Sequence, residues 1–104
     1  MLSDVKRIVE EGHLGVATYE QFAQACLQQA AAGGSDAVAL FVFAKLVQPF
    51  IEYYYHEALN EARAVSFRND LLAALNAYDA AATLEERHRV LADAIRRNFE
   101  TFDS

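Results

Sequence analysis

The sequence contains little cysteine, proline or glycine, and no tryptophan. Its single cysteine, Cys26, excludes an internal disulfide and a zinc site built from cysteines. The residues that interrupt helices are few, with one proline and four glycines. The sequence has 20 alanines, the residue with the highest helix propensity. β-Branched residues nowhere alternate with polar ones over the length of a strand. The composition therefore predicts an all-α protein.

Positive charge is also scarce, with 9 Lys and Arg against 15 Asp and Glu and a formal net charge of -6. Nucleic-acid binding needs clustered basic residues, and pairs such as Arg96 and Arg97 have acidic neighbours. We therefore expect no nucleic-acid partner, whereas a protein with a basic surface would be attracted. No apolar run follows the N-terminal basic pair Lys6 and Arg7, so no secretory signal is predicted and a cytoplasmic location is expected.

A length of 104 residues and a hydrophobic content of 54% indicate one globular domain over residues 1–104. Its most apolar segment runs from Ala37 to Ala44 without a polar residue. A helix that is apolar on every side must be covered on every side, by its own chain or by another. A membrane span over residues 37–55 is not expected, because Lys45 near the centre of that window costs roughly 3 kcal/mol in a bilayer.

The periodicity predicts an antiparallel bundle of about five helices around the first half of a long central helix, residues 36–65. A straight helix of that length would be about 43 Å long, more than the diameter expected for a domain of this size. Pro49 predicts a kink, because it lacks an amide for the carbonyl of Lys45. A break is expected near Val65 and Ser66, where the apolar stripe changes side.

Three helix starts carry capping residues. Ser3 is predicted to cap the first helix, which Gly12 ends. Capping boxes start further helices at Thr18 and at Thr83, each with Gln or Glu three residues later. The apolar positions expected in the core or in an interface are Phe22, Leu27, Leu40, Phe41, Phe43, Leu71, Leu75, Leu91 and Ile95.

Two pairs of side chains resemble metal ligands or acid–base groups. Glu85 and His88 are three residues apart, a spacing found in di-iron bundles, and Glu52 and His56 are four apart. A solvated pair on a helix surface also explains Glu52 and His56, and a core histidine bonded to a neighbour also explains His88, which lies between Leu84 and Leu91. No Ser or Cys nucleophile and no phosphate-binding loop accompanies them, so the sequence favours a protein that is not an enzyme and has no cofactor. Glu52, His56, Glu85 and His88 remain as an alternative metal site.

Three consecutive tyrosines follow Pro49. They span about 200° of a helix surface, so they do not all face one core. Tyrosine is enriched in interfaces, and its ring also lines apolar pockets, so core, interface and pocket all remain open for this cluster. The residues expected in an interface or pocket are Phe41, Phe43, Phe50, Tyr53, Tyr54 and Tyr55.

Together these features predict a soluble helical interaction module, of the adaptor, chaperone-like or immunity type, that forms a homodimer through its central helix. The alternative is a bundle that binds a small molecule or a metal through residues 53–57 and the pair Glu85 and His88.

Overall fold

The computed structural model describes residues 2–102, with side chains up to residue 98. No strand occurs in this part of the chain, so the predicted all-α class is confirmed. Only Val47 separates the third helical segment from the fourth, which makes five helices if the two are counted together. The segments are α1 (Ser3–Glu11), α2 (Val16–Ala31), α3 (Ala37–Leu46), α4 (Gln48–His56), α5 (Glu61–Ala80) and α6 (Leu84–Phe102).

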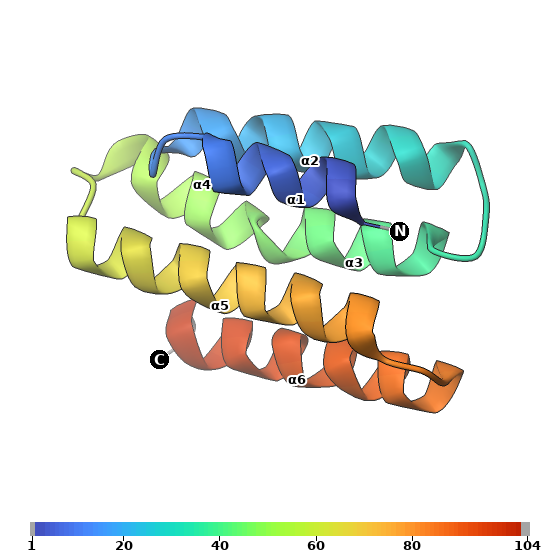
Figure 1. The fold of residues 1–104 in the computed structure, drawn as a ribbon. Coiled ribbons are helices and arrows are strands. Elements are labelled where there is room, and N and C mark those ends of the chain that lie inside the picture. Colours follow the sequence, from blue (N-terminus) through green and yellow to red (C-terminus); the bar gives the residue numbers. More distant parts are fainter. Residues whose placement is uncertain (1, 103–104) are drawn as a thin grey trace.

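The helices form a closed ring around a shared core. Helix α1 packs on α2 and α5, α2 packs on α3 and α4, and α6 joins α3 to α5. With α3 and α4 counted together, successive helices run in opposite directions (Figure 1), and the molecule measures 39 × 26 × 19 Å. Its largest fully buried side chains point into the ring from α1, α2, α3, α4 and α5 and include Val5, Val9, Tyr19, Phe22, Phe43, Phe50 and Leu75.

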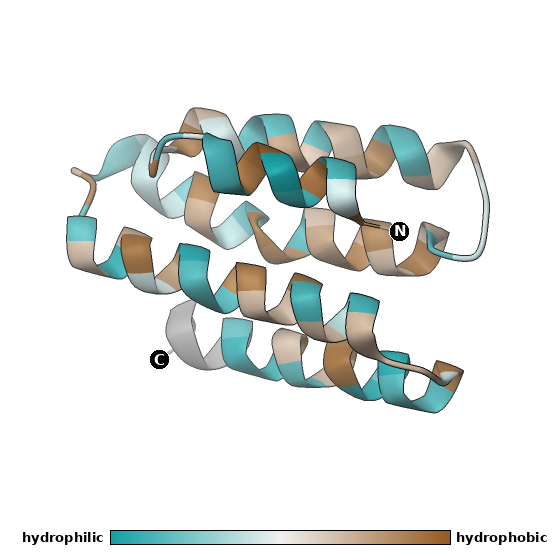
Figure 2. Cartoon of the chain, viewed as in Figure 1, coloured by the Kyte–Doolittle hydropathy of each residue, from teal (hydrophilic) through white to brown (hydrophobic). Residues whose placement is uncertain are grey.

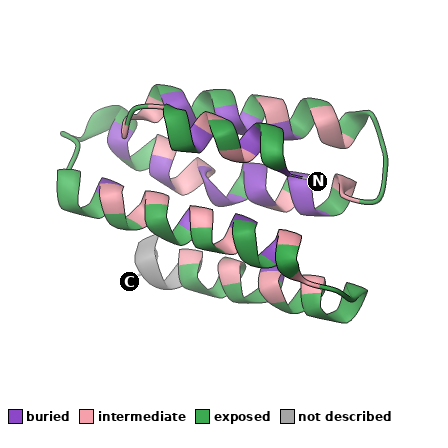
Figure 3. Ribbon diagram, viewed as in Figure 1, coloured by how far each residue is buried: buried purple, intermediate pink, exposed green. Residues whose placement is uncertain are grey.

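Helix α3 is one wall of this ring: the compact arrangement of helices agrees with the predicted bundle, but α3 is not covered on every side. Leu40, Phe43 and Val47 face the core, whereas Val38 and Phe41 are 69% and 50% exposed. The apolar colouring of α3 in Figure 2 therefore extends beyond the buried positions in Figure 3. The reason is geometric: covering a helix on every side requires more neighbours than this short chain provides. Leu27 and Ile95, expected in the core or in an interface, are also exposed.

The predicted central helix of residues 36–65 ends early, at His56. Glu57 is extended, with φ -117° and ψ 150°, and α5 begins at Glu61. Asn60 caps α5, since its side-chain oxygen accepts a hydrogen bond from the amide of Arg63 at 3.0 Å. The break therefore lies several residues before the predicted position at 65–66. Asparagine is among the best N-cap residues, and this local signal was missed in the sequence.

Only one of the two predicted capping boxes exists. The hydroxyl of Thr83 accepts a hydrogen bond from the amide of Glu86 at 3.1 Å, and the Glu86 carboxylate accepts one from the amide of Ala82 at 3.0 Å. Thr18, by contrast, lies inside α2 and is buried, because that helix already begins at Val16. The prediction of a cap at Thr18 is wrong.

Glycines lie at or just after the C-terminal ends of α1 and α2. Gly12 ends α1 as predicted, although Ser3 makes no side-chain cap and is itself the first helical residue. Gly33 and Gly34 have φ angles of 87° and 101°, a region that favours glycine, and they stop the chain from continuing α2.

Candidate functional site

The four candidate metal ligands lie far apart. Glu52 and His56 belong to α4, whereas Glu85 and His88 belong to the first turns of α6, at the opposite end of the bundle (Figure 1). All four side chains are exposed. In the part of the chain that the structure describes, no group of three His, Cys, Asp or Glu side chains could hold a metal ion. The fold therefore does not bring these two pairs together into one site.

Three of the six aromatic candidates belong to the core. Phe43 and Phe50 are fully buried, and Tyr54 is nearly so. The ring of Phe50 lies 4.6 Å from that of Phe67, 4.7 Å from that of Tyr19 and 4.7 Å from that of Tyr54, between centroids. Such contacts stabilise the fold and leave Phe43 and Phe50 no surface to offer a partner, so their assignment to an interface or pocket is corrected.

The other three aromatic candidates are exposed. Tyr53 and Tyr55 on α4 are 47% and 68% exposed, and Phe41 on α3 is also half exposed. The ammonium of Lys45 lies 5.3 Å from the centroid of the Phe41 ring, a cation–π contact. The tyrosine cluster is therefore divided: Tyr54 faces the core and its two neighbours face outward.

Five exposed residues of α3 and α4, together with the half-buried Gln48, lie along one side of the two helices; Tyr53 and His56 are also exposed but do not belong to this set. They follow one another at steps of three and four residues, the spacing that keeps side chains on one face. We call this set the outer stripe: Val38, Phe41, Lys45, Gln48, Glu52 and Tyr55.

The segment Ala37–His56 is also long and apolar enough to cross a membrane, judged by length and composition alone. Core helices of soluble proteins pass the same test. Here the outer stripe carries Lys45, Gln48 and Glu52 in its middle, so its exposed side is polar at the centre and apolar at both ends.

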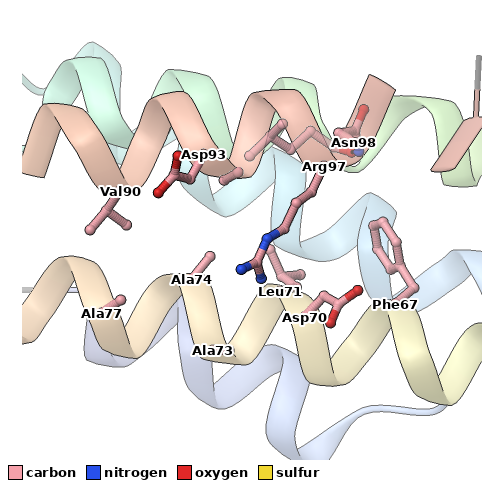
Figure 4. A pocket seen from close by; sticks show the side chains of 12 residues that line it. Phe67, Asp70, Leu71, Ala73, Ala74, Ala77, Val90, Asp93, Arg97 and Asn98 are labelled. Carbon is pink, nitrogen blue, oxygen red and sulfur yellow. Dashed lines mark hydrogen bonds between the residues drawn. The ribbon is translucent and has the colours of Figure 1, made fainter. Parts of the chain in front are cut away.

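A groove of about 270 Å³ separates α5 from α6 (Figure 4). Leu46 and Phe67 lie among its apolar lining, and Arg97 extends across it from α6 toward α5. The side chain of Asn98 donates a hydrogen bond to the carbonyl of Leu46 at 2.7 Å and ties α6 to α3 beside the groove. Small side chains on the facing sides of the two helices leave this space unfilled, namely Ala73, Ala74, Ala77 and Ala94.

Sequence reasoning missed this groove. The only signal in the sequence is a set of alanines near Asp70 and Asp93 in two helices, and alanines are also expected there from helix propensity alone. None of residues 53–57 lines it, and neither does Glu85 or His88.

A shallower groove lies between α2 and α4. It is lined by Leu27, Gln48 and Ile51 among others, so it borders the middle of the outer stripe. Leu27 is exposed there, which places additional apolar surface beside the stripe.

Burial controls the titration of the groups inside the ring. Desolvation raises the pKa of the Cys26 thiol to about 12 and that of Tyr19 to about 12, the latter opposed by the charge of Arg68. Burial and the nearby Asp36 carboxylate also raise the pKa of Tyr78, whose hydroxyl donates a hydrogen bond to Asp36 at 3.2 Å. All three groups stay protonated at neutral pH, so Cys26 is a poor nucleophile.

No protein-family model matches this chain, and comparison with curated proteins and with solved structures finds no significant similarity.

Proposed function

We propose that this chain is a non-enzymatic interaction module that acts in the cytoplasm and forms a homodimer through α3 and α4. The observation that carries the proposal is the exposure of Val38 and Phe41, two large apolar side chains on a helix whose other side builds the core. Exposed apolar surface of this kind is typical of protein interfaces. The polar centre of the outer stripe favours a protein surface over lipid as the covering partner.

In this proposal Pro49 sets the bend between α3 and α4. It lies in the first turn of α4, where its missing amide removes no bond within that helix. The carbonyl of Lys45, four residues earlier, is the one that loses a helical partner. The bend would shape the face that the partner covers.

A second partner would be recognised through charge. The net charge of -6 favours association with a protein that has a basic surface, as an adaptor, chaperone-like or immunity-type protein would require.

Light scattering coupled to size-exclusion chromatography tests the dimer. We expect a mass of about twice 11.6 kDa for the native chain at micromolar concentration. Phe41→Asp should give a folded monomer, because it places a charge in the buried part of the interface. Asn69→Asp on the exposed side of α5 adds the same charge elsewhere and should leave the dimer intact. A native chain that is monomeric, or that binds phosphatidylcholine vesicles instead, would contradict the proposal.

The groove between α5 and α6 favours a second candidate function, the binding of a small apolar molecule. Its volume is near the lower end of the range for ligand pockets, and Asp70, Asp93 and Arg97 lie among its mainly apolar lining. Native mass spectrometry of the purified protein would reveal a carried ligand, and Ala74→Leu should remove it by filling the groove.

A further inference from the structure

We infer that the two outer stripes pair antiparallel in the dimer, with the two-fold axis beside Gln48, so that Lys45 of each chain meets Glu52 of the other. This inference rests on the proposed homodimer and adds its orientation and register.

The outer stripe has the spacing of a helix-pairing seam. From residue 38 to 55 its steps are three, four, three, four and three residues, the repeat that two packed helices use. A second series, buried, runs along the opposite side of the same segment at the same steps: Leu40, Phe43, Val47, Phe50 and Tyr54. The segment therefore presents one seam to its own core and a second seam to the outside.

The order of side chains along the outer stripe determines the orientation. Val38 and Phe41 stand at one end and Tyr55 at the other, with Lys45, Gln48 and Glu52 between them. From either end toward the centre, the stripe begins with apolar residues, continues with one charged residue and reaches the neutral, polar Gln48. Two copies in opposite directions therefore place apolar residues on apolar residues and a Lys on a Glu.

The register follows from the same symmetry. In an antiparallel pair about a two-fold axis, the numbers of facing residues have a constant sum, because residue i faces j and j faces i. Pairing Lys45 with the partner's Glu52 places the axis between Gln48 and Pro49, so the two Gln48 side chains lie close to each other. Phe41 then lies opposite the partner's His56, next to the partner's Tyr55. The same sum brings Val38 toward the partner's Leu59, which is exposed in the loop after α4.

A parallel pair would place Lys45 on Lys45 and Glu52 on Glu52, and like charges at an interface oppose binding. Within one chain Lys45 lies in α3 and Glu52 in α4, a separation of about 10 Å at the rise of a helix, so they do not neutralise each other. The partner chain is therefore the natural source of the opposite charge.

Surface beside the stripe also suits a second copy. The shallow groove between α2 and α4 borders Gln48 and contains Leu27 and Ile51. It lies next to the inferred axis, so each chain would cover the other's groove and enlarge the apolar part of the interface.

Charge exchange tests the pairing. Lys45→Glu alone and Glu52→Lys alone should each raise the dimer dissociation constant roughly tenfold, because two attractive pairs become repulsive in a symmetric dimer. The double variant K45E/E52K should restore the native value within about threefold. In a parallel dimer the single variants would change little, since each replaces one pair of like charges by another. Sedimentation velocity over a concentration series gives these constants.

Disulfide trapping tests the position of the axis. Gln48→Cys should form a covalent dimer with oxidised glutathione, because the two positions face each other across the axis. Val38→Cys is the control: Val38 is more exposed than Gln48, but its two copies would lie about 30 Å apart and should not join. The native Cys26 is buried and does not compete.

The outcomes separate the two proposals. If the native chain is a monomer, the proposed homodimer fails and this inference with it. The native chain could instead be a dimer whose charge variants have the native dimer dissociation constant, or in which Val38→Cys cross-links as readily as Gln48→Cys. In either case the dimer stands and the antiparallel register is overturned.

Discussion

Gly12 and Thr18 lie against each other where α1 gives way to α2. A Cβ atom at Gly12 would stand 2.5 Å from the Thr18 methyl, 2.6 Å from its hydroxyl and 2.7 Å from the carbonyl of Ile8. We expect Gly12→Ala to lower the free energy of unfolding by about 1–3 kcal/mol, because a buried side chain and the backbone would have to move apart. Urea unfolding measures the loss.

Gly15, three residues later, is the control for this prediction. A Cβ atom there would meet nothing within 4 Å, and the residue has a φ of -85°, which alanine adopts readily. Because Gly15 is the N-cap of α2, where alanine is less favourable than glycine, Gly15→Ala should have a small cost, below that of Gly12→Ala. Equal losses for the two variants would contradict the close approach at Gly12.

Tyr19 and Cys26 make the fold sensitive to alkali. Their pKa values are about 12 in the folded chain, against 10.0 and 9.0 for the free groups. A raised pKa in the folded state means that the unfolded chain loses its protons first, so stability is fully present below about pH 9 and falls as the pH rises toward 12. Chemical denaturation at a series of pH values should show this fall.

Tyr19→Phe isolates one of these groups. At pH 11 the native chain should have lost roughly 1 kcal/mol more than this variant. At pH 7 the variant should be as stable as the native chain or more so, since the buried Tyr19 hydroxyl has no hydrogen-bond partner among the described residues. Parallel pH profiles for the two proteins would disprove the assignment.

Among single residues, periodicity identified which side of each helix faces the core. Phe22, Phe43, Leu75 and Leu91 were expected in the core or in an interface, and all are buried. Periodicity does not tell how wide the covered side is, because that depends on how many neighbouring helices reach it. Phe41 is half exposed for this reason.

At the scale of a helix, Thr83 offers the clearest test. Its hydroxyl satisfies the amide of Glu86 at the start of α6. Thr83→Ala should cost about 1 kcal/mol, the usual effect of losing such a cap. Ser3→Ala is the matched control and should cost far less, because Ser3 makes no side-chain cap. Thermal unfolding followed by circular dichroism compares the two, and an equal loss would refute the role of Thr83.

The boundaries of the helices show how far a capping residue in the sequence predicts where a helix begins. Thr18 and Thr83 have the same sequence pattern, yet only Thr83 caps, because Gly15 lets the chain enter α2 early and places Thr18 against Gly12. Asn60 gave an equally good signal that was overlooked in favour of the change in apolar stripe near Val65. A capping residue marks where a helix is able to begin, and packing decides whether it does.

At the scale of the whole molecule, substitutions at Phe43 and Phe41 distinguish an effect on folding from an effect on the proposed dimer. Phe43 is fully buried and lies 6.2 Å from Tyr78, between ring centroids. Phe43→Asp should abolish cooperative unfolding, because an unpaired buried carboxylate costs several kcal/mol out of a small total. Phe41→Asp should keep a melting temperature within a few degrees of native. A Phe43→Asp variant that melts normally would contradict the architecture of the ring.

The arrangement of the ring was beyond the reach of the sequence. Its closure depends on α1 meeting α5, two segments separated by about 50 residues, and no local pattern encodes such a contact. The groove between α5 and α6 likewise depends on which alanines face each other. The outer stripe could be read from the sequence as a repeat of three and four, but its exposure could not.

Ring closure by α1 has a consequence for how the protein opens. This short part of the wall, nine residues, is anchored by Leu2, Val5 and Val9, and the amide of Leu2 donates a hydrogen bond to Asp79 at 3.4 Å. Detaching so few contacts requires less free energy than global unfolding, so the amides of residues 3–11 should exchange with deuterium as one early unit. The state reached in this way exposes a strip of aliphatic interior while the remaining helices stay folded, and self-association on storage would begin from it.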